Sequence, residues 1–252
     1  MKILMKRLIE GVQYTGNDFI FDFKNDTDSD IIYLKNKSFN KKMSKTSNNQ
    51  IFYSYKYGKD FHDSVVKNKF LVELKHLKLP DKYINILISK AINNFNAIHN
   101  VSSFDVIITP KSSAPLANEI AKRIRAKAGA NTILCTDAFV KNSVENLQVN
   151  QEKVDKIQGP SKKAFESQLK KATATGILNM KEIKNVRWRR LVSNFLTFDS
   201  QISRKVFNAI HDGRVLIIDD IITTNTTIVE MNKQVNKLLP QEVCNFVLIS
   251  AL

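Results

Sequence analysis

The chain has 252 residues, of which 43% are hydrophobic and 25% charged, a composition typical of a soluble globular protein with one core and a smaller appended part. No apolar run is long enough to cross a bilayer, and the amino-terminal stretch is too short and too charged for a secretory signal, so we expect no membrane association. Two cysteines and four scattered histidines lack metal-ligand spacing. This argues against a zinc site and favours a reducing, cytoplasmic location.

The formal net charge of +15 is the strongest global property of the sequence. A surface of this sign attracts polyanions such as nucleic acid, nucleotides or pyrophosphate. A composition rich in lysine and asparagine can equally serve only to keep a protein soluble. Charge alone therefore leaves a nucleic-acid partner open.

Residues 1–100 are expected to form an N-terminal α+β extension. Short apolar runs alternate here with turn-rich and basic stretches, and two amphipathic patterns follow them. The predicted elements are strands at 19–23 and 31–34, a polar loop at 35–49, an alternating aromatic strand face at 51–60, and helices at 61–77 and 80–99.

Residues 101–252 are expected to form the core, and its first strand is the aliphatic run at 104–109. A short polar loop containing Lys111, Ser112 and Ser113 follows, and a helical pattern begins directly after it. A strand, a polar loop and a helix N-terminus place free backbone N–H groups where an anion can bind. The alternative is an ordinary turn between a strand and a helix.

The next predicted strand is 130–137, and a long polar insertion at about 138–199 follows it. Within the insertion, Ser161 is a candidate cap for a helix at 162–172.

A basic aromatic cluster lies near the end of this insertion. It consists of Arg187, Trp188, Arg189 and Arg190 and contains the single tryptophan of the chain. Basic residues around an aromatic ring can hold a nucleic-acid strand or a base. The alternative is that the tryptophan anchors a hydrophobic core while the arginines stay in solvent.

The stretch VLIIDDIITTNTTIVE, at 215–230, is the centre of the predicted core. Its first four residues form a continuous aliphatic run, which is typical of a strand buried on both faces of a parallel sheet. Asp219 and Asp220 follow at the carboxyl end of this strand, and a loop of threonines then leads into a helical pattern. A helix at 200–210 precedes this stretch, and a strand at 243–252 closes the sheet.

This order of residues suits a phosphorylated sugar. The loop and the helix N-terminus offer hydroxyls and free backbone N–H groups to a phosphate. The two aspartates just upstream can accept hydrogen bonds from sugar hydroxyls, directly or through a metal ion. The loop residues are Thr223, Thr224, Asn225, Thr226 and Thr227.

The motif IIDDIITTNTTI, at 217–228, resembles the phosphoribosyl pyrophosphate (PRPP) binding motif of type I phosphoribosyltransferases. That motif is a hydrophobic strand, two acidic residues, hydrophobic residues and then Thr-Thr-Gly-small-Thr. The resemblance implies a doubly wound α/β fold, in which helices flank a mostly parallel sheet, with a hood or flexible-loop insertion. It also implies that the aspartates contact the ribose and, indirectly, Mg²⁺, that the threonine loop holds the 5-phosphate, and that Lys111, Ser112 and Ser113 hold pyrophosphate.

One residue departs from the family pattern, because Asn225 stands where the family has glycine. Glycine is used where φ must be positive or where the backbone must approach a ligand closely. Asparagine is the next most tolerant residue for a left-handed conformation, so the loop is expected to fold. Its side chain can still crowd the phosphate, which leaves catalytic activity open.

The resemblance predicts a protein that binds PRPP or a phosphoribosylated nucleotide with Mg²⁺. Its expected reaction is transfer of the phosphoribosyl group to a nitrogenous base with release of pyrophosphate. The string YKYGKD, at 55–60, resembles ComF-like competence proteins, which are linked to DNA uptake. That branch suggests the alternative function, a non-catalytic nucleic-acid-associated protein that keeps the fold. Either function is compatible with a homodimer, and a structural protein of a larger assembly is the third alternative.

Overall fold

The computed structural model describes residues 6–9, 12–14, 19–21, 32–34, 51–56, 63–185, 187–222 and 225–250. These ranges include almost the whole of the predicted core. The loop predicted at 35–49 lies outside the described residues, as do Thr223 and Thr224 of the predicted phosphate loop.

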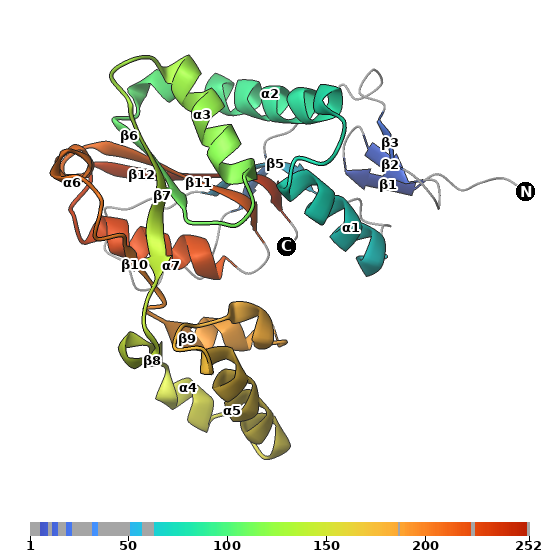
Figure 1. Cartoon of the computed structure of the whole chain (residues 1–252), viewed down its shortest axis with the longest axis vertical. Coiled ribbons are helices and arrows are strands. Elements are labelled where there is room, and N and C mark those ends of the chain that lie inside the picture. The colour runs from blue at the N-terminus through green and yellow to red at the C-terminus, as the bar shows by residue number, and fades with distance from the viewer. Residues whose placement is uncertain are drawn as a thin grey trace, which may run out of the picture.

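A seven-stranded sheet forms the centre of the described part of the chain (Figure 1). Its order is β10-β7-β6-β11-β12-β5-β4; the strands from β7 to β5 are parallel, and β10 and β4 are antiparallel edge strands. The fold is therefore α/β with a mostly parallel sheet, as predicted. The strands are β4 Ile32–Leu34, β5 Ile51–Lys56, β6 Val106–Pro110, β7 Ile133–Lys141, β10 Leu196–Phe198, β11 Arg214–Ile222 and β12 Glu242–Ser250.

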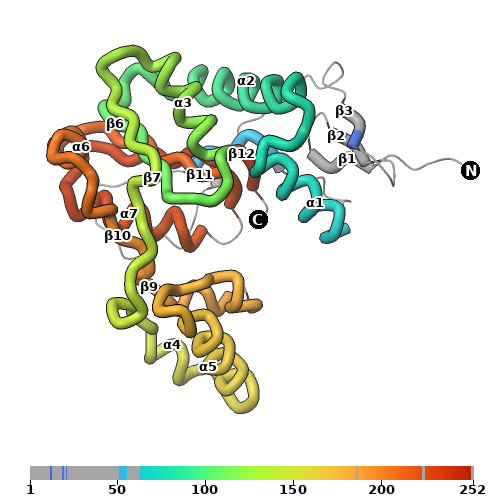
Figure 2. The backbone as a smooth tube through the Cα atoms, viewed as in Figure 1, coloured from blue at the N-terminus to red at the C-terminus, as the bar shows by residue number. Residues whose placement is uncertain are grey.

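Helices cover both faces of this sheet (Figures 1 and 2). Three of them, α1, α2 and α3, share a hydrophobic cluster with one face, and α6 and α7 share a second cluster with the other. This two-sided covering is compatible with a doubly wound fold. The helices are α1 Ser64–Lys75, α2 Asp81–Ile98, α3 Leu116–Ala128, α4 Gln151–Asp155, α5 Pro160–Thr173, α6 Arg204–Ile210 and α7 Thr226–Asn236.

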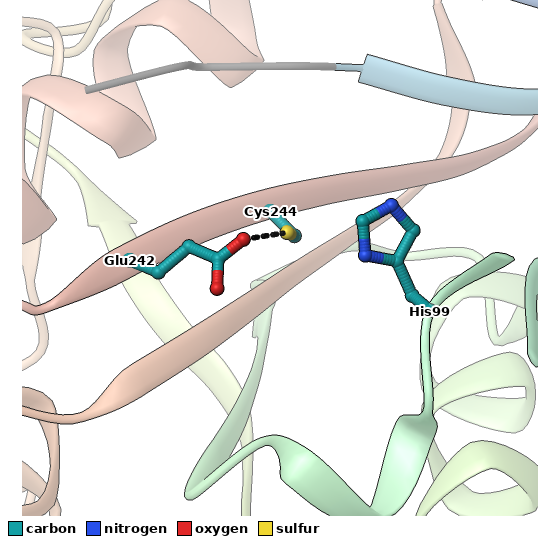
Figure 3. Close-up of side chains that lie close together, drawn as sticks. All are labelled: His99, Glu242 and Cys244. Atoms are coloured by element: carbon teal, nitrogen blue, oxygen red, sulfur yellow. Dashed lines mark hydrogen bonds between the residues drawn. The ribbon is translucent and has the colours of Figure 1, made fainter.

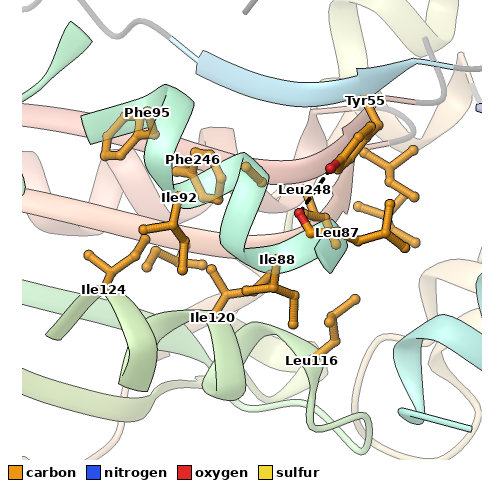
Figure 4. Packing of buried hydrophobic residues seen from close by; sticks show 14 of the residues in the cluster. Tyr55, Leu87, Ile88, Ile92, Phe95, Leu116, Ile120, Ile124, Phe246 and Leu248 are labelled. Carbon is orange, nitrogen blue, oxygen red and sulfur yellow. Dashed lines mark hydrogen bonds between the residues drawn. The ribbon is translucent and has the colours of Figure 1, made fainter. Parts of the chain in front are cut away.

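The central strands β11 and β12 are buried almost along their whole length. A parallel strand covered on both faces has no solvent-facing side, which is why both sequences are mostly apolar and do not alternate with polar residues. On one face Phe246 and Leu248 lie in the cluster that also contains Ile92 and Phe95 of α2 (Figure 4). This packing holds α2 against the middle of the sheet.

The part of the chain predicted as an N-terminal extension contributes directly to the main sheet. β5 pairs in parallel with β12, and the Tyr55 hydroxyl donates a hydrogen bond to the Leu87 carbonyl oxygen at 2.9 Å. A separate small sheet lies beside α1 and α2, where Phe21 stacks on Tyr83. Its strands are β1 Lys6–Ile9, β2 Val12–Tyr14 and β3 Phe19–Phe21.

The insertion forms a lobe that projects from the ends of β7 and β10 (Figure 1). β7 continues to Lys141, where it pairs with β10, so the inserted segment is 142–195 and shorter than the predicted 138–199. The lobe contains α4, α5 and a short ladder of β8 Gln148–Val149 with β9 Val192–Ser193.

The predicted cap of the insertion helix is wrong by two residues. α5 begins at Pro160, and Gly159 is its N-cap, so Ser161 already lies in the first turn. Proline suits the first helical position because its φ is fixed near the helical value and its missing N–H has no partner there.

Candidate functional site

The direction in which the chain winds across the sheet changes between the neighbouring strands β6 and β11. The crossover from β6 through α3 leads to β7 on one side, whereas the crossover from β11 through α7 leads to β12 on the other. In open α/β sheets, ligands bind outside the carboxyl ends of the strands at such a switch point. The topology alone therefore predicts a ligand site at this edge of the sheet.

The register of β6 and β11 places the two predicted binding loops next to each other. Ile108 pairs with Ile217, and two residues further along each strand stand Pro110 and Asp219. The loop after β6 therefore begins beside the acid pair of β11. Residues 109 positions apart in the sequence reach one sheet edge in this way.

The two aspartates lie inside β11, and not after the strand as predicted. Pairing with β12 continues to Ile222, opposite Ser250, and this pairing extends the strand past the acid pair. Asp220 is buried, with 5% of its surface exposed, and its backbone N–H donates to Oδ1 of Asp219 at 2.9 Å. The carboxylates still lie within the last four residues of the strand.

Asp219 of the acid pair binds a proton more tightly than an ordinary aspartate does. Burial, and then the negative charge of Asp220, raise the pKa of Asp219 from 3.8 to about 7. The Asp220 N–H and the Lys75 ammonium act in the opposite direction. The electrostatic repulsion between two adjacent carboxylates with too little countercharge is reduced by a proton, by hydroxyl donors or by a bound cation.

Among the described residues, Lys75 in the last turn of α1 supplies the positive charge that contacts this pair. Its Nζ lies 3.0 Å from Oδ1 of Asp220, and its side chain is 35% exposed. The sequence gives no signal for this contact, since Lys75 is one of many lysines and lies 145 positions from its partner. It could be found only from the way α1 packs beside the sheet edge.

We expect Lys75→Met to lower the stability of the fold at pH 8. The substitution keeps the aliphatic stem but leaves the buried Asp220 carboxylate without its cation. Loss of one partner of a fully buried pair costs about 3–5 kcal/mol. Because Lys75 is partly exposed, solvent screening reduces the expected loss to about 1–2 kcal/mol.

Urea denaturation of this variant measures the loss. Lys78→Met is the matched control, since Lys78 is exposed three residues later, beyond the end of α1, and should change stability by less than about 0.5 kcal/mol. Equal stabilities for the two variants would show that the Lys75–Asp220 contact contributes nothing.

Asn225 adopts a left-handed backbone conformation at the start of α7. It is the N-cap of α7 with φ 62° and ψ −3°, in the left-handed region, and its carbonyl oxygen accepts from the Val229 N–H at 2.8 Å. Its side chain is buried, and no described donor reaches Oδ1. The expectation that asparagine tolerates a left-handed conformation at this position agrees with the geometry.

We predict different effects on stability for two substitutions of Asn225. Asn225→Gly should change stability by less than about 0.5 kcal/mol, because glycine adopts positive φ freely. Asn225→Ala should lower it by about 1–2 kcal/mol, because alanine populates the left-handed region much less readily than asparagine does. Thermal or urea denaturation measures both.

The ligand affinity of the same variants tests whether the side chain crowds a phosphate. Asn225→Gly should bind a phosphate ligand at least as tightly as the parent. Asn194, at φ 60° in the insertion, is the control, and its glycine variant should bind as the parent does. Weaker binding by Asn225→Gly alone would instead make the amide a ligand contact.

The loop after β6 is exposed and leads into a helix whose N-terminus has no side-chain cap. Lys111, Ser112 and Ser113 are all exposed, and α3 has Pro115 at its N-cap without a capping hydrogen bond. Ser112 Oγ accepts from the Ala114 N–H at 3.1 Å. The first turn of α3 therefore presents N–H groups toward the same edge as the acid pair.

A polar network beneath this loop was not predicted. The buried Thr109 hydroxyl donates to Oδ1 of Asn118 at 2.5 Å and accepts from the Asp137 N–H at 3.1 Å. Asn118 Nδ2 donates to Asp137 Oδ1 at 3.3 Å. Asp137 has φ 59° at an irregularity in the pairing of β6 with β7. The network joins β6, α3 and β7, and it adds a third carboxylate on a strand next to the loop.

The basic aromatic cluster lies in the insertion lobe. The Trp188 ring is half-buried and packs edge-on against Phe165 of α5, with ring centroids 5.8 Å apart. Arg189 Nε donates to the Ile183 carbonyl oxygen at 2.9 Å, whereas Arg187 and Arg190 are exposed. The tryptophan and one arginine thus have structural partners, and two arginines face solvent.

Comparison with known proteins gives no relative for this chain: no family model matches it, and no curated protein matches it. Among the helices in the described ranges, none combines the length and apolarity that a membrane span requires. The interpretation of the site therefore depends on its own geometry.

Proposed function

We propose that this protein binds PRPP, or another phosphorylated ribose, at the carboxyl edge of β6 and β11. The observation that supports this most is the convergence of two helix N-termini and an acid pair at the switch point of the sheet. Helix N-termini attract phosphates, and carboxylates accept hydrogen bonds from sugar hydroxyls. A ribose with a phosphate at one end and a pyrophosphate at the other offers these groups in the matching order.

Each element has a separate role in this proposal. Asp219 and Asp220 accept hydrogen bonds from the ribose hydroxyls. The N-terminus of α7, with the threonines at 223, 224, 226 and 227, holds the 5-phosphate. The N-terminus of α3, with Lys111 and the serines at 112 and 113, holds the pyrophosphate.

The donor set at this edge fits Mg²⁺. Carboxylate oxygens are the ligands that this hard cation prefers. The raised pKa of Asp219 indicates that the positive charge near the two carboxylates is too small to offset their negative charge. Asp219 and Asp220 would hold the cation, directly or through water and the substrate. The chemistry that Mg²⁺ supplies when bound is neutralisation of the pyrophosphate and of the ribose oxygens.

The proposed reaction is displacement at the anomeric carbon of the ribose. The bond from this carbon to the pyrophosphate oxygen breaks, its electron pair leaves with pyrophosphate, and a bond to a nitrogen of the acceptor base forms. The proton that this nitrogen carried passes to pyrophosphate or to solvent. Positive charge develops on the sugar, and no nucleophile from the protein is required. The protein contributes by holding both ends of the substrate in line and by placing carboxylates beside the developing charge.

A melting-temperature shift with PRPP and Mg²⁺ tests the proposal. A ligand at 100 times its Kd stabilises a protein by about 2.7 kcal/mol, which corresponds to roughly 5–10 °C at this chain length. PRPP with Mg²⁺ should raise the melting temperature by this amount, and ribose without phosphate should not. No shift with PRPP up to millimolar concentration would contradict the proposal.

The insertion lobe supports a second candidate function, binding of nucleic acid. Segment 142–195 contains 11 Lys and Arg against five Asp and Glu, and Lys163, Lys170 and Lys171 on α5 are exposed. Binding through these charges would weaken steeply with salt. Replacing the three lysines by glutamine should then reduce DNA affinity at low salt by about tenfold or more, without any effect of added PRPP. Unchanged affinity would place the DNA contact elsewhere or exclude it.

A further inference from the structure

A group of three potential metal ligands lies at the amino ends of β11 and β12, the end of the sheet opposite to the proposed substrate site. Glu242 and Cys244 are two residues apart on β12 and so share one face of the strand. His99 follows α2 as its C-cap residue. The ligand atoms of these three side chains all lie within 4.8 Å of one another (Figure 3).

The spacing of two of these atoms already approaches that of a zinc site. Cys244 Sγ donates to Glu242 Oε1 at 3.3 Å. With Zn–S near 2.3 Å and Zn–O near 2.0 Å, tetrahedral coordination separates sulfur and oxygen by about 3.5 Å. A cation replacing the thiol proton would therefore need almost no movement of this pair, and the imidazole would need to approach by roughly 1 Å.

Neighbouring residues orient two of the ligands. Arg214 Nε donates to Glu242 Oε2 at 2.8 Å, which leaves Oε1 facing the thiol. The His99 ring packs against Phe52 and Phe95, with ring centroids 4.3 and 5.3 Å away. Support of this kind, from groups behind the ligands, is typical of metal sites in proteins.

We propose that His99, Glu242 and Cys244 bind a thiophilic divalent cation, Zn²⁺, with one coordination position left for water. Thiolate, imidazole and carboxylate are the three ligand types that zinc takes from proteins. His99 and Glu242 are half-buried, so the cation has access from solvent, whereas Cys244 is buried. The site would join the end of α2 to the central strand β12.

The charge balance limits the expected affinity. A thiolate and a carboxylate offset the two charges of the cation, but the nearby Arg214 guanidinium adds one positive charge. We therefore expect weaker binding than in a four-ligand structural zinc site.

The sequence gives no signal for this group of ligands, because 142 residues separate His99 from Glu242 and no spacing motif links them.

Cobalt(II) titration of protein stripped with a chelator tests the proposal, because a cobalt–thiolate bond gives a strong near-ultraviolet charge-transfer band. We expect a saturable band at one equivalent of cobalt that added Zn²⁺ abolishes. Cys244→Ser should lose the band. Cys135→Ser is the matched control, since Cys135 is the other free thiol, and should keep it.

His99→Gln provides a second variant in case Cys244→Ser does not fold. It retains the thiol and should bind cobalt at least tenfold more weakly. Zn²⁺ should raise the melting temperature of the parent protein but not that of this variant. Absence of the band in the parent would overturn the proposal. A band that disappears in Cys135→Ser and remains in Cys244→Ser would overturn it as well. Neither result bears on PRPP binding at the other end of the sheet.

Discussion

Replacing Asp219 and Asp220 together by asparagine is expected to abolish PRPP binding. A hydrogen bond to a charged group contributes about 1.5–3 kcal/mol. Loss of two such bonds to ribose hydroxyls would therefore weaken binding by about 10²–10⁴-fold. Asparagine keeps the size of the side chain and removes the charge, so the change reports on charge and not on packing. Isothermal titration calorimetry with PRPP and Mg²⁺ measures the effect.

Asp212→Asn is the control for this experiment. Asp212 is an exposed aspartate close to the start of β11, and its φ of 55° suits asparagine equally well. This variant should bind PRPP as the parent protein does. A double variant of the acid pair that still binds PRPP with the parent's affinity would show that these carboxylates do not hold the ribose.

The second large effect concerns stability, and its sign is opposite to that of a typical aspartate. Asp219 has a pKa of about 7 in the folded protein, against 3.8 in the unfolded chain. The folded state therefore binds more protons between about pH 4 and pH 7, and stability falls as pH rises through this window. Above pH 7 the cost of this half-buried charge is fully present.

Asp219→Asn removes this charge and should stabilise the protein at pH 8. A shift of one pKa unit corresponds to 1.36 kcal/mol, and we expect a gain of about 2–4 kcal/mol. The difference from the parent should shrink as pH falls from 7 toward 4. Urea denaturation at pH 5 and pH 8 measures it.

Asp212→Asn again serves as the control, because it removes an exposed charge and should show no such pH dependence. An Asp219→Asn variant that is less stable than the parent at pH 8 would contradict the raised pKa. A variant that gains stability while losing PRPP binding would show that the acid pair is kept for binding at a cost in stability.

Local patterns in the sequence predict the central elements of this fold. The aliphatic run before Asp219 indicates β11, because a buried strand requires apolar residues on both faces. The small polar loop before residue 226 indicates the start of α7, because helices commonly begin after small polar residues. The pairing that carries β11 past the acid pair to Ile222 comes from β12, a separate strand, and could not be predicted from the run itself.

Contacts between distant segments explain the rest of what the sequence did not reveal. The participation of β5 in the main sheet, the ion pair of Lys75 with Asp220 and the network of Thr109, Asn118 and Asp137 each join elements far apart in the chain. Hydrophobic periodicity describes which face of an element is buried, but it does not say which partner buries it. The candidate metal ligands are hidden for the same reason.

The most direct test of the central claim is a crystal structure of the protein with PRPP and Mg²⁺. We predict that the 5-phosphate accepts hydrogen bonds from the N–H groups of the first turn of α7 and that the ribose hydroxyls lie on Asp219 and Asp220. The pyrophosphate should then lie at the N-terminus of α3, beside Lys111. Crystals grown with saturating PRPP that show the ligand elsewhere, or show no ligand at this edge of the sheet, would contradict the account.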